Sequence, residues 1–360
     1  MPIREHFLTP DDQELWRKFM PERSSVYGSL GNALIGEKLL NRVARLHVIE
    51  SEEGWISYPM YLRSLSQLPF TVDTGSHWDS GTPEFTGPYI FGEGRTLSQR
   101  YPEFRKSFAQ RKGIVAEFAH LNPWTGAEQI LQDSSSFDRQ IIWCDTTIDP
   151  ECLRHNHLEH RCRKSLNKGE KAGLQAVEIS GSQEIREFVR IYQGTMSRNN
   201  AMESYYFNEE YFTAFRDFLP SNSRFTLTIY QGRAVGALLV LFDDENVYAY
   251  LGGSDVSFHH LSPATFQIWD AITWAHRSGK KRVVLGGGYV ANDGIFRFKA
   301  SFSPLLRPFY IYRKIHRRDD YMRLDQAFRT FHQLKNEQVS YFPSYRYTPR
   351  SATQPIPVCK

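Results

Sequence analysis

The chain has 360 residues, of which 41% are hydrophobic and 14% aromatic, and its formal net charge at pH 7 is +4. This length exceeds the usual size of one hydrophobic core, so two domains are expected. The mild positive charge is far from the footprint of a dedicated DNA-binding domain, and no apolar run approaches the ~20 residues of a membrane helix. These properties predict a cytoplasmic monomer that binds no DNA and has no integral membrane segment.

Short β-like runs separated by polar loops dominate the first 150 residues. The runs cover residues 45–51, 54–65, 113–121 and 139–148. A loop rich in Gly, Ser, Thr and Pro lies between Asp73 and Pro88. The pattern changes after residue 149, where the chain becomes polar, basic and helix-compatible, and this change predicts a domain boundary near residue 152.

The second half has a more regular order of elements. A basic helix ends at a C-cap, Gly173, and an amphipathic helix follows with Ser182 as its N-cap. Three hairpin-connected strands (224–230, 233–242 and 247–254), a helix over 264–277 that begins after Ser262 and Pro263, and a strand over 281–287 complete the series. A helix between the last two strands predicts a parallel crossover pair in a mixed sheet. This order is that of a GNAT-type acyltransferase core.

Six segments together resemble the Fem family, two-domain GNAT-like proteins that include the aminoacyl-tRNA-dependent transferases of peptidoglycan cross-bridge synthesis. They are "SYPMYLR", "EFTGPYIFG", "AEFAHLNPW", "RCRKSLNKGEKAGLQAVEI", "IYQGTMSRNNAMESYYFNEEYF" and "GIFRFKASFSP". The resemblance implies an α/β (α+β) fold of two tandem GNAT-like domains, each a mixed twisted sheet flanked by helices, with an acceptor cleft between them. The expected domains are residues 1–152 and 153–318, and a C-terminal helix and tail, 319–360, returns to the first domain.

Three consecutive glycines, Gly286, Gly287 and Gly288, follow the last strand of this core and precede Asp293 and Lys299. Glycines at the carboxyl end of a strand let a backbone approach a ligand closely, although a flexible surface connection would look the same. Asp293 is either a proton acceptor for an amine or a turn residue before a glycine.

Lys299 alternates with phenylalanines in "FRFKASF", which predicts a strand that holds its ammonium between apolar side chains. A fixed cation there would stabilise the oxyanion that develops when an amine attacks an ester, and the resemblance implies this catalytic role. The alternative is a solvent-facing lysine on an amphipathic strand.

Further substrate-binding candidates lie on the preceding segments. Arginine suits phosphate or carboxylate, and tyrosine offers a stacking surface and a hydroxyl, although helix capping and packing would also explain these residues. The resemblance implies that the segment after the amphipathic helix borders the acceptor cleft. The candidates are Arg198, Asn199, Tyr205, Tyr206, Tyr250 and Ser254.

The donor is expected to be an aminoacyl-tRNA rather than a bound cofactor. The segment "YLGGSDVSFHHLSPA" lacks the usual spaced glycines of a loop that holds CoA pyrophosphate at a helix N-terminus. The basic helix instead offers Arg161, Arg163, Lys164 and Lys168 to RNA phosphates, unless it is simply a solvated helix.

The chain shows no recognisable metal site or covalent nucleophile motif. Four cysteines show no CxxC spacing, no carboxylate or cysteine completes a site with the clustered histidines, and no GxSxG, Walker or HExxH motif is present. No metal and no bound cofactor are therefore expected. The residues concerned are Cys144, Cys152, Cys162 and Cys359, with His155, His157, His160, His259 and His260.

The leading hypothesis is direct transfer of an aminoacyl group from tRNA to an amine of a cell-wall, glycan or peptide-type acceptor, a small molecule or nucleotide-linked. The first alternative is an N-acyltransferase that uses acetyl-CoA or another acyl-CoA on an amino sugar or related precursor. The second is a non-catalytic protein that binds such a ligand.

Overall fold

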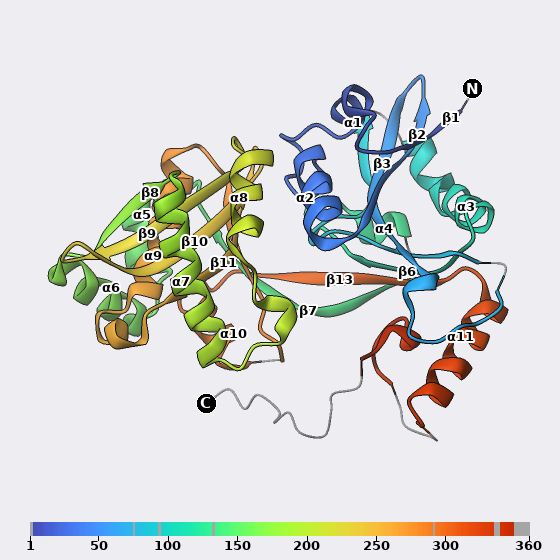
Figure 1. Cartoon of the computed structure of the whole chain (residues 1–360). Coiled ribbons are helices and arrows are strands. Elements are labelled where there is room, and N and C mark those ends of the chain that lie inside the picture. The colour runs from blue at the N-terminus through green and yellow to red at the C-terminus, as the bar shows by residue number, and fades with distance from the viewer. Residues whose placement is uncertain are drawn as a thin grey trace. The chain divides into compact units, whose positions relative to one another are not determined.

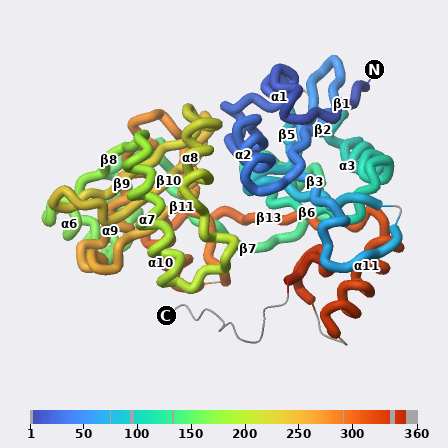
Figure 2. Tube along the Cα trace, in the orientation of Figure 1, coloured from blue at the N-terminus to red at the C-terminus, as the bar shows by residue number. Residues whose placement is uncertain are grey.

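The computed structural model describes residues 3–74, 76–92, 95–131, 134–290, 292–334 and 339–348, and within them the chain forms two compact units (Figure 1). The first unit comprises the chain up to Pro21, Tyr27–Asp138 and the described residues from Pro308 onward. The second comprises Glu22–Val26 and Arg139–Arg307. The chain passes between them in β7 (Ser135–Asp145) and β13 (Leu306–Ile315), as Figure 2 traces. The boundary inside β7 precedes the predicted one at residue 152 because residues 142–145 of this strand already pair with β12 of the second unit.

The first unit contains a mixed sheet. Its β4–β6 pair is parallel and its other pairs are antiparallel. The strands run in the order β1 (Arg4–Leu8), β2 (Val43–Ser51), β3 (Gly54–Ser64), β4 (Trp78–Gly81), β6 (Ile114–His120) and β13, and β5 (Tyr89–Gly92) pairs with β3.

Helices cover this sheet with separate apolar clusters. α1 (Gln13–Phe19) and α2 (Leu30–Leu40) contribute to one cluster, and α3 (Arg95–Arg111) and α4 (Ala127–Leu131) to another. α11 (Arg318–Phe331) packs Leu324 and Phe328 against Val115 and Ala116 of β6. It corresponds to the C-terminal helix expected within residues 319–360, of which residues 335–338 and 349–360 lie outside the described residues. The one-turn helix η5 (Ser344–Arg346) reaches β4, where the Tyr345 hydroxyl donates to Asp79 Oδ1 at 2.6 Å.

The second unit contains the sheet that the sequence predicts. β9, β10 and β11 are sequential antiparallel neighbours, and β11 pairs with β12 in parallel, so both predictions are confirmed. The order of strands is β7, β12 (Arg282–Gly286), β11 (Asn246–Ser254), β10 (Arg233–Phe242), β9 (Ser223–Tyr230) and β8 (Gln175–Ile179).

Helices lie on both faces of this second sheet (Figure 1). Val247 and Ala249 of β11 belong to an apolar cluster with α5, α6 and α9, whereas Tyr250, on the opposite face, contacts α8. The basic helix predicted from the sequence is divided into two helices, α5 and α6. At the break between them, Arg163 Nη1 donates hydrogen bonds to the carbonyl oxygens of residues 155 and 158. The bounds are α5 (Pro150–Asn156), α6 (His160–Ala172), α7 (Ser182–Arg198), α8 (Glu209–Phe218) and α9 (Pro263–Arg277).

Two local predictions are wrong. The N-cap of α7 is Gly181 rather than Ser182, and no side chain caps that helix. The segment around Lys299 is not a strand but the helix α10 (Gly294–Ala300). Asp293 is its N-cap and accepts a hydrogen bond from the Phe296 backbone N–H at 2.7 Å, which favours the first helical turn over an extended chain.

Candidate active site

The sheet of the second unit opens where β11 and β12 separate. Their parallel pairing covers three residue pairs and stops at Tyr248 and Val284. Beyond that point each strand has a bulge against its other neighbour, at Tyr250 in β11 and at Leu285 in β12. Residues 249–253 are half-exposed although β11 is a central strand. The separation therefore leaves backbone accessible in the middle of the sheet, where bulges commonly mark functional sites.

The predicted glycines and Lys299 meet at the carboxyl end of β12. The half-buried Lys299 Nζ donates to Gly287 O at 2.8 Å, and a Cβ on Gly286, which has a φ of +76°, would lie 3.4 Å from it. The side chain of Arg139, from β7, lies across Gly287, where a Cβ would come within 3.0 Å of its Cδ. Arg139 Nη1 then donates to Gly288 O at 2.7 Å. Charged side chains thus hold successive carbonyls of this loop, which opposes the alternative of a flexible connection.

Asp293 holds the other side of the same loop. Its carboxylate accepts the backbone N–H groups of Tyr289 at 2.7 Å and Val290 at 3.2 Å in addition to that of Phe296. Burial acts to raise the pKa of Asp293, but these hydrogen bonds outweigh it and lower the pKa below its ordinary value. A Cβ on Gly288 would lie 2.3 Å from Asp293 Oδ1, so glycine is needed there. This geometry favours the turn role of Asp293 over a proton acceptor.

A group of tyrosines adjoins the loop. The Tyr211 and Tyr250 hydroxyls are 2.9 Å apart, and the Tyr192 hydroxyl donates to Tyr205 O at 2.8 Å. Burial, followed by the neighbouring phenols of Tyr211, Tyr205 and Tyr289, raises the pKa of Tyr192. Tyr289 belongs to the glycine loop, so its influence on Tyr192 relates the loop after β12 to α7.

Arg198 and Ser254 meet where α7 crosses the end of β11. Arg198 Nη1 donates to Ser254 O at 3.1 Å, and Thr195 Oγ1 accepts the Ser254 N–H at 3.0 Å. The Ser254 Oγ lies 3.1 Å from His259 Nε2. Burial, and then the charge of Arg198, lower the pKa of His259, so its ring is neutral at pH 7. These contacts commit the Ser254 backbone to the packing of α7, and leave its hydroxyl beside a neutral imidazole.

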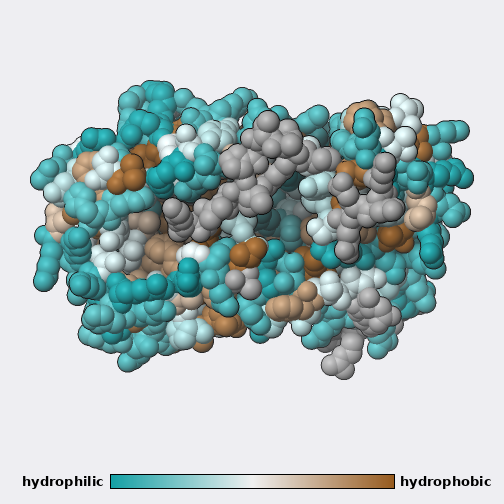
Figure 3. Space-filling model, turned by 90° about the horizontal axis from the view of Figure 1, so that it is seen from below, coloured by the Kyte–Doolittle hydropathy of each residue, from teal (hydrophilic) through white to brown (hydrophobic). Residues whose placement is uncertain are grey.

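Apolar side chains are exposed around the glycine loop. Tyr289 is 68% and Val290 69% exposed, and Phe298 of the following helix α10 is exposed as well; Met202 and Tyr206, in the segment after α7, are also exposed. Figure 3 shows a face on which most residues are hydrophilic and hydrophobic residues form small patches. Asn199, the C-cap of α7, is exposed as well. Exposed aromatic and aliphatic side chains beside fixed peptide groups suit contact with a substrate.

The four predicted tRNA contacts divide into two pairs. Arg163 donates to backbone carbonyls at the end of α5, and Arg161 pairs with Glu159 and donates to Arg297 O of α10 at 2.7 Å. Lys164 and Lys168, by contrast, are exposed on α6. α6 packs on the helix η4 (Val256–Leu261), where a Cβ on Gly169 would lie 3.1 Å from Leu261 O. The helix that carries the two lysines thus packs on the segment that follows β11.

In the turn between β11 and α9, backbone N–H groups donate hydrogen bonds to oxygen atoms of the turn itself. The backbone N–H groups of Ser257, Phe258 and Ser262 donate to oxygen atoms of residues 255 and 259. α9 begins with Pro263, which has no N–H, and its N-cap makes no side-chain hydrogen bond. Asp255 adds a carboxylate to the same turn. Few donors are left there for the pyrophosphate of a CoA molecule.

Sequence reasoning missed several residues of this region. Arg139 lies 149 residues before its partner, so no local pattern reveals it. Tyr289 directly follows the glycines, and that adjacency was a usable signal. The missed residues are Arg139, Tyr192, Thr195, Tyr211, His259 and Tyr289.

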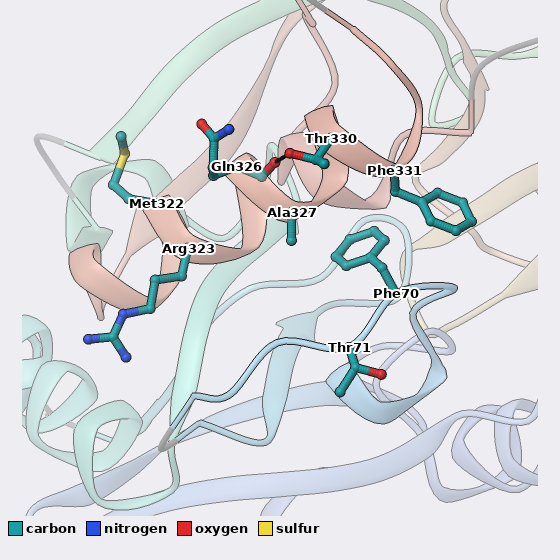
Figure 4. Close-up of a pocket in the computed structure, with 8 residues that line it drawn as sticks. All are labelled: Phe70, Thr71, Met322, Arg323, Gln326, Ala327, Thr330 and Phe331. Atoms are coloured by element: carbon teal, nitrogen blue, oxygen red, sulfur yellow. Dashed lines mark hydrogen bonds between the residues drawn. The ribbon is translucent and has the colours of Figure 1, made fainter.

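A separate groove lies in the first unit. It has a volume of about 700 Å³ and is lined by Phe70 and Thr71 on one side and by α11 residues such as Ala327 and Phe331 on the other (Figure 4). None of the predicted site residues lines it. Within the described ranges, no group of three or more histidine, cysteine or acidic residues could hold a metal ion, and no helix is long and apolar enough to span a membrane.

Comparisons with known proteins agree with this architecture. Residues 157–300 match the family model described as an acetyltransferase (GNAT) domain, and no curated protein matches the sequence at a significant level. The structure of FemX has 13% identity and a TM-score of 0.63, with 89% of this chain and 99% of that chain covered. A conserved protein of unknown function from Bacteroides thetaiotaomicron has 12% identity and a TM-score of 0.54, with 87% and 99% covered.

A third similar structure is the C-terminal domain of a putative lysylphosphatidylglycerol synthetase from Agrobacterium fabrum. It has 15% identity and a TM-score of 0.51, with 84% of this chain and 91% of that chain covered. Residues 157–300 therefore form the GNAT-type domain of an acyltransferase, and the fold of the chain is similar to that of FemX. Within that class it has the Fem-like fold of two GNAT-like domains, and the sequence prediction of this fold is confirmed.

Proposed function

We propose that this acyltransferase moves an aminoacyl group from aminoacyl-tRNA to an amine of a cell-wall, glycan or peptide-type acceptor. The acceptor amine attacks the ester carbonyl at the tRNA 3′ end directly. A C–N bond forms, the C–O bond to the ribose breaks, and the amine proton is transferred to the departing ribose oxygen. No covalent enzyme intermediate and no bound cofactor are required.

The closed turn after β11 is the observation that carries the choice of donor. A CoA pyrophosphate needs unpaired backbone N–H groups at the start of a helix. Here the N–H groups of Ser257, Phe258 and Ser262 are used within the turn, and Pro263 has none. An RNA donor does not require unpaired backbone N–H groups at a helix start, because lysines can bind its phosphates along an open surface. The exposed Lys164 and Lys168 on the adjoining α6 support this choice.

Lys299 is the proposed catalytic residue. When the amine attacks, negative charge develops on the former carbonyl oxygen, and a fixed cation in a partly dehydrated site stabilises it. The hydrogen bond to Gly287 O fixes the ammonium at the open end of β12. Arg198, Asn199, Tyr205, Tyr206, Tyr250 and Ser254 are the proposed substrate-binding residues, together with the three glycines, whose loop Asp293 holds in place.

A transfer assay tests this proposal. The full-length chain is incubated with tRNA carrying a labelled amino acid and with amine acceptors of the three classes. The expected product carries the label in an alkali-stable amide, and ribonuclease treatment of the donor abolishes its formation. Absence of ribonuclease-sensitive transfer to every acceptor would overturn the proposal.

The alternative donor is an acyl-CoA, which the match to an acetyltransferase domain favours. Calorimetric titration with CoA separates the two donors. Micromolar binding together with transfer from acetyl-CoA would establish the alternative, whereas no heat of binding at millimolar CoA supports the RNA donor.

A further inference from the structure

We propose that Arg139 of β7 is a positioning residue that sets Tyr289 at the substrate-binding face of the site. The inference deepens the proposed function, and only its kinetic test rests on that function. Its basis is the way in which three side chains, one from β7 and two from α10 and its N-cap, hold the backbone of the glycine loop.

Arg139 and Asp293 hold opposite ends of one peptide group. Arg139 Nη1 donates to Gly288 O at 2.7 Å, and the N–H of the same peptide unit, which belongs to Tyr289, donates to Asp293 Oδ2 at 2.7 Å. The peptide unit is planar, so fixing its oxygen and its N–H fixes its orientation. The position from which the Tyr289 side chain departs is thereby set.

The preceding peptide group is fixed in a similar way by Lys299, which donates to Gly287 O at 2.8 Å. The three glycines leave room for these side chains: a Cβ on Gly286 would approach Lys299, one on Gly287 would approach Arg139, and one on Gly288 would approach Asp293. Arg139, Asp293 and Lys299 together form a clamp on the loop, and each glycine accommodates one of these charged side chains.

Tyr289 has the placement expected of a substrate contact. Its side chain is 68% exposed, and its backbone N–H is held by Asp293 next to the peptide oxygen that Arg139 holds. An exposed phenol fixed at its backbone loses little conformational freedom when a ligand binds. It suits an aromatic or apolar group of the donor or the acceptor.

Hydrogen exchange measures the clamp without any substrate. In the full-length Arg139→Ala variant, the amides of residues 287–290 are expected to exchange about ten-fold faster than in the wild type, because local opening becomes easier. Arg139→Lys, which keeps one cationic donor, should exchange at an intermediate rate. Arg186→Ala, which removes an exposed arginine on the first turns of α7, is the control and should leave these amides unchanged. Unchanged exchange in Arg139→Ala would overturn the inference.

A double-mutant cycle tests the link to Tyr289 once transfer is detected. Arg139→Ala and Tyr289→Ala should each lower kcat/KM about ten-fold, and the double variant should lose no more than either single variant. Additive losses would show that Arg139 does not act through Tyr289 and would overturn the inference. If the wild type transfers nothing but Arg139→Ala still accelerates loop exchange, the proposed function fails and the clamp stands.

Discussion

Gly253 of β11 lies directly against Thr195 of α7: a Cβ on Gly253 would come within 2.5 Å of Thr195 Oγ1 and 2.9 Å of Ile191 O. The close approach allows Thr195 Oγ1 to accept the Ser254 N–H and brings Arg198 to Ser254 O. Gly253 thus serves to bring a helix onto the sheet.

Gly253→Ala should therefore destabilise the protein by about 1–3 kcal/mol, because the added methyl group forces α7 away from β11. Gly194→Ala, on α7, is the matched control, since a Cβ at Gly194 meets nothing within 4 Å. It should stabilise the protein by about 0.5–1 kcal/mol through its better helix propensity. Thermal unfolding followed by circular dichroism measures both changes, and equal melting temperatures for the two variants would contradict this account.

Removal of the Lys299 charge should slow chemistry more than binding. Lys299→Met keeps most of the aliphatic stem, and kcat for aminoacyl transfer is expected to fall by about 100-fold to 1,000-fold while the melting temperature stays nearly unchanged. Lys106→Ala, which removes an exposed lysine of α3, should retain full activity. A kcat for Lys299→Met within three-fold of the wild type would remove Lys299 from the mechanism.

The core topology of the second unit could be predicted because each of its signals is local. Alternating apolar residues mark β9 to β11, and Pro263 and the stop after Arg277 mark α9, so the crossover followed from their order. α10 was missed because its phenylalanines alternate over a few residues as they would in a strand. The N-cap Asp293, three residues before Phe296, was the competing signal.

The clamp on the glycine loop could not be predicted in full. The order of glycines, Asp293 and Lys299 along the chain indicated a site, and these residues do meet. Arg139 reaches the loop only because β7 pairs with β12 far along the chain. α3 was also missed: its segment is strongly polar and contains Pro102, which usually argues against a helix interior.

His47 should make stability depend on pH between about 6.5 and 4. Its ring is fully buried. Burial lowers its pKa from 6.5 to about 4; the hydrogen bond with Glu5 acts to raise the pKa, and the charge of Arg105 lowers it further. In the unfolded chain the ring takes up a proton near pH 6.5, so the unfolding free energy falls as the pH falls through this window. His47→Phe should flatten that slope in urea unfolding at several pH values, whereas the exposed-site control His155→Gln should not.

Glu117 should govern a second, more acidic window. Burial would raise its pKa, but the charge of Arg105 and the hydrogen bond and charge of His316 outweigh burial and lower it to about 2. The carboxylate accepts from Arg105 Nε at 2.9 Å and lies 2.8 Å from His316 Nε2. Because the folded pKa lies below the ordinary value of 4.5, this stabilisation is complete above pH 4.5 and is lost as the pH falls towards 2.

Glu117→Gln should abolish that acid dependence and cost about 3–5 kcal/mol at neutral pH, since it leaves the Arg105 charge buried without its partner. Replacing both residues in Arg105→Met/Glu117→Leu should cost less than Glu117→Gln alone, because no buried charge is left uncompensated. Urea unfolding at pH 7 and pH 3 measures both effects. A double variant less stable than the single one would mean that the pair contributes through its packing with Tyr58 and Phe108, which lie within 5 Å of the guanidinium, rather than through charge.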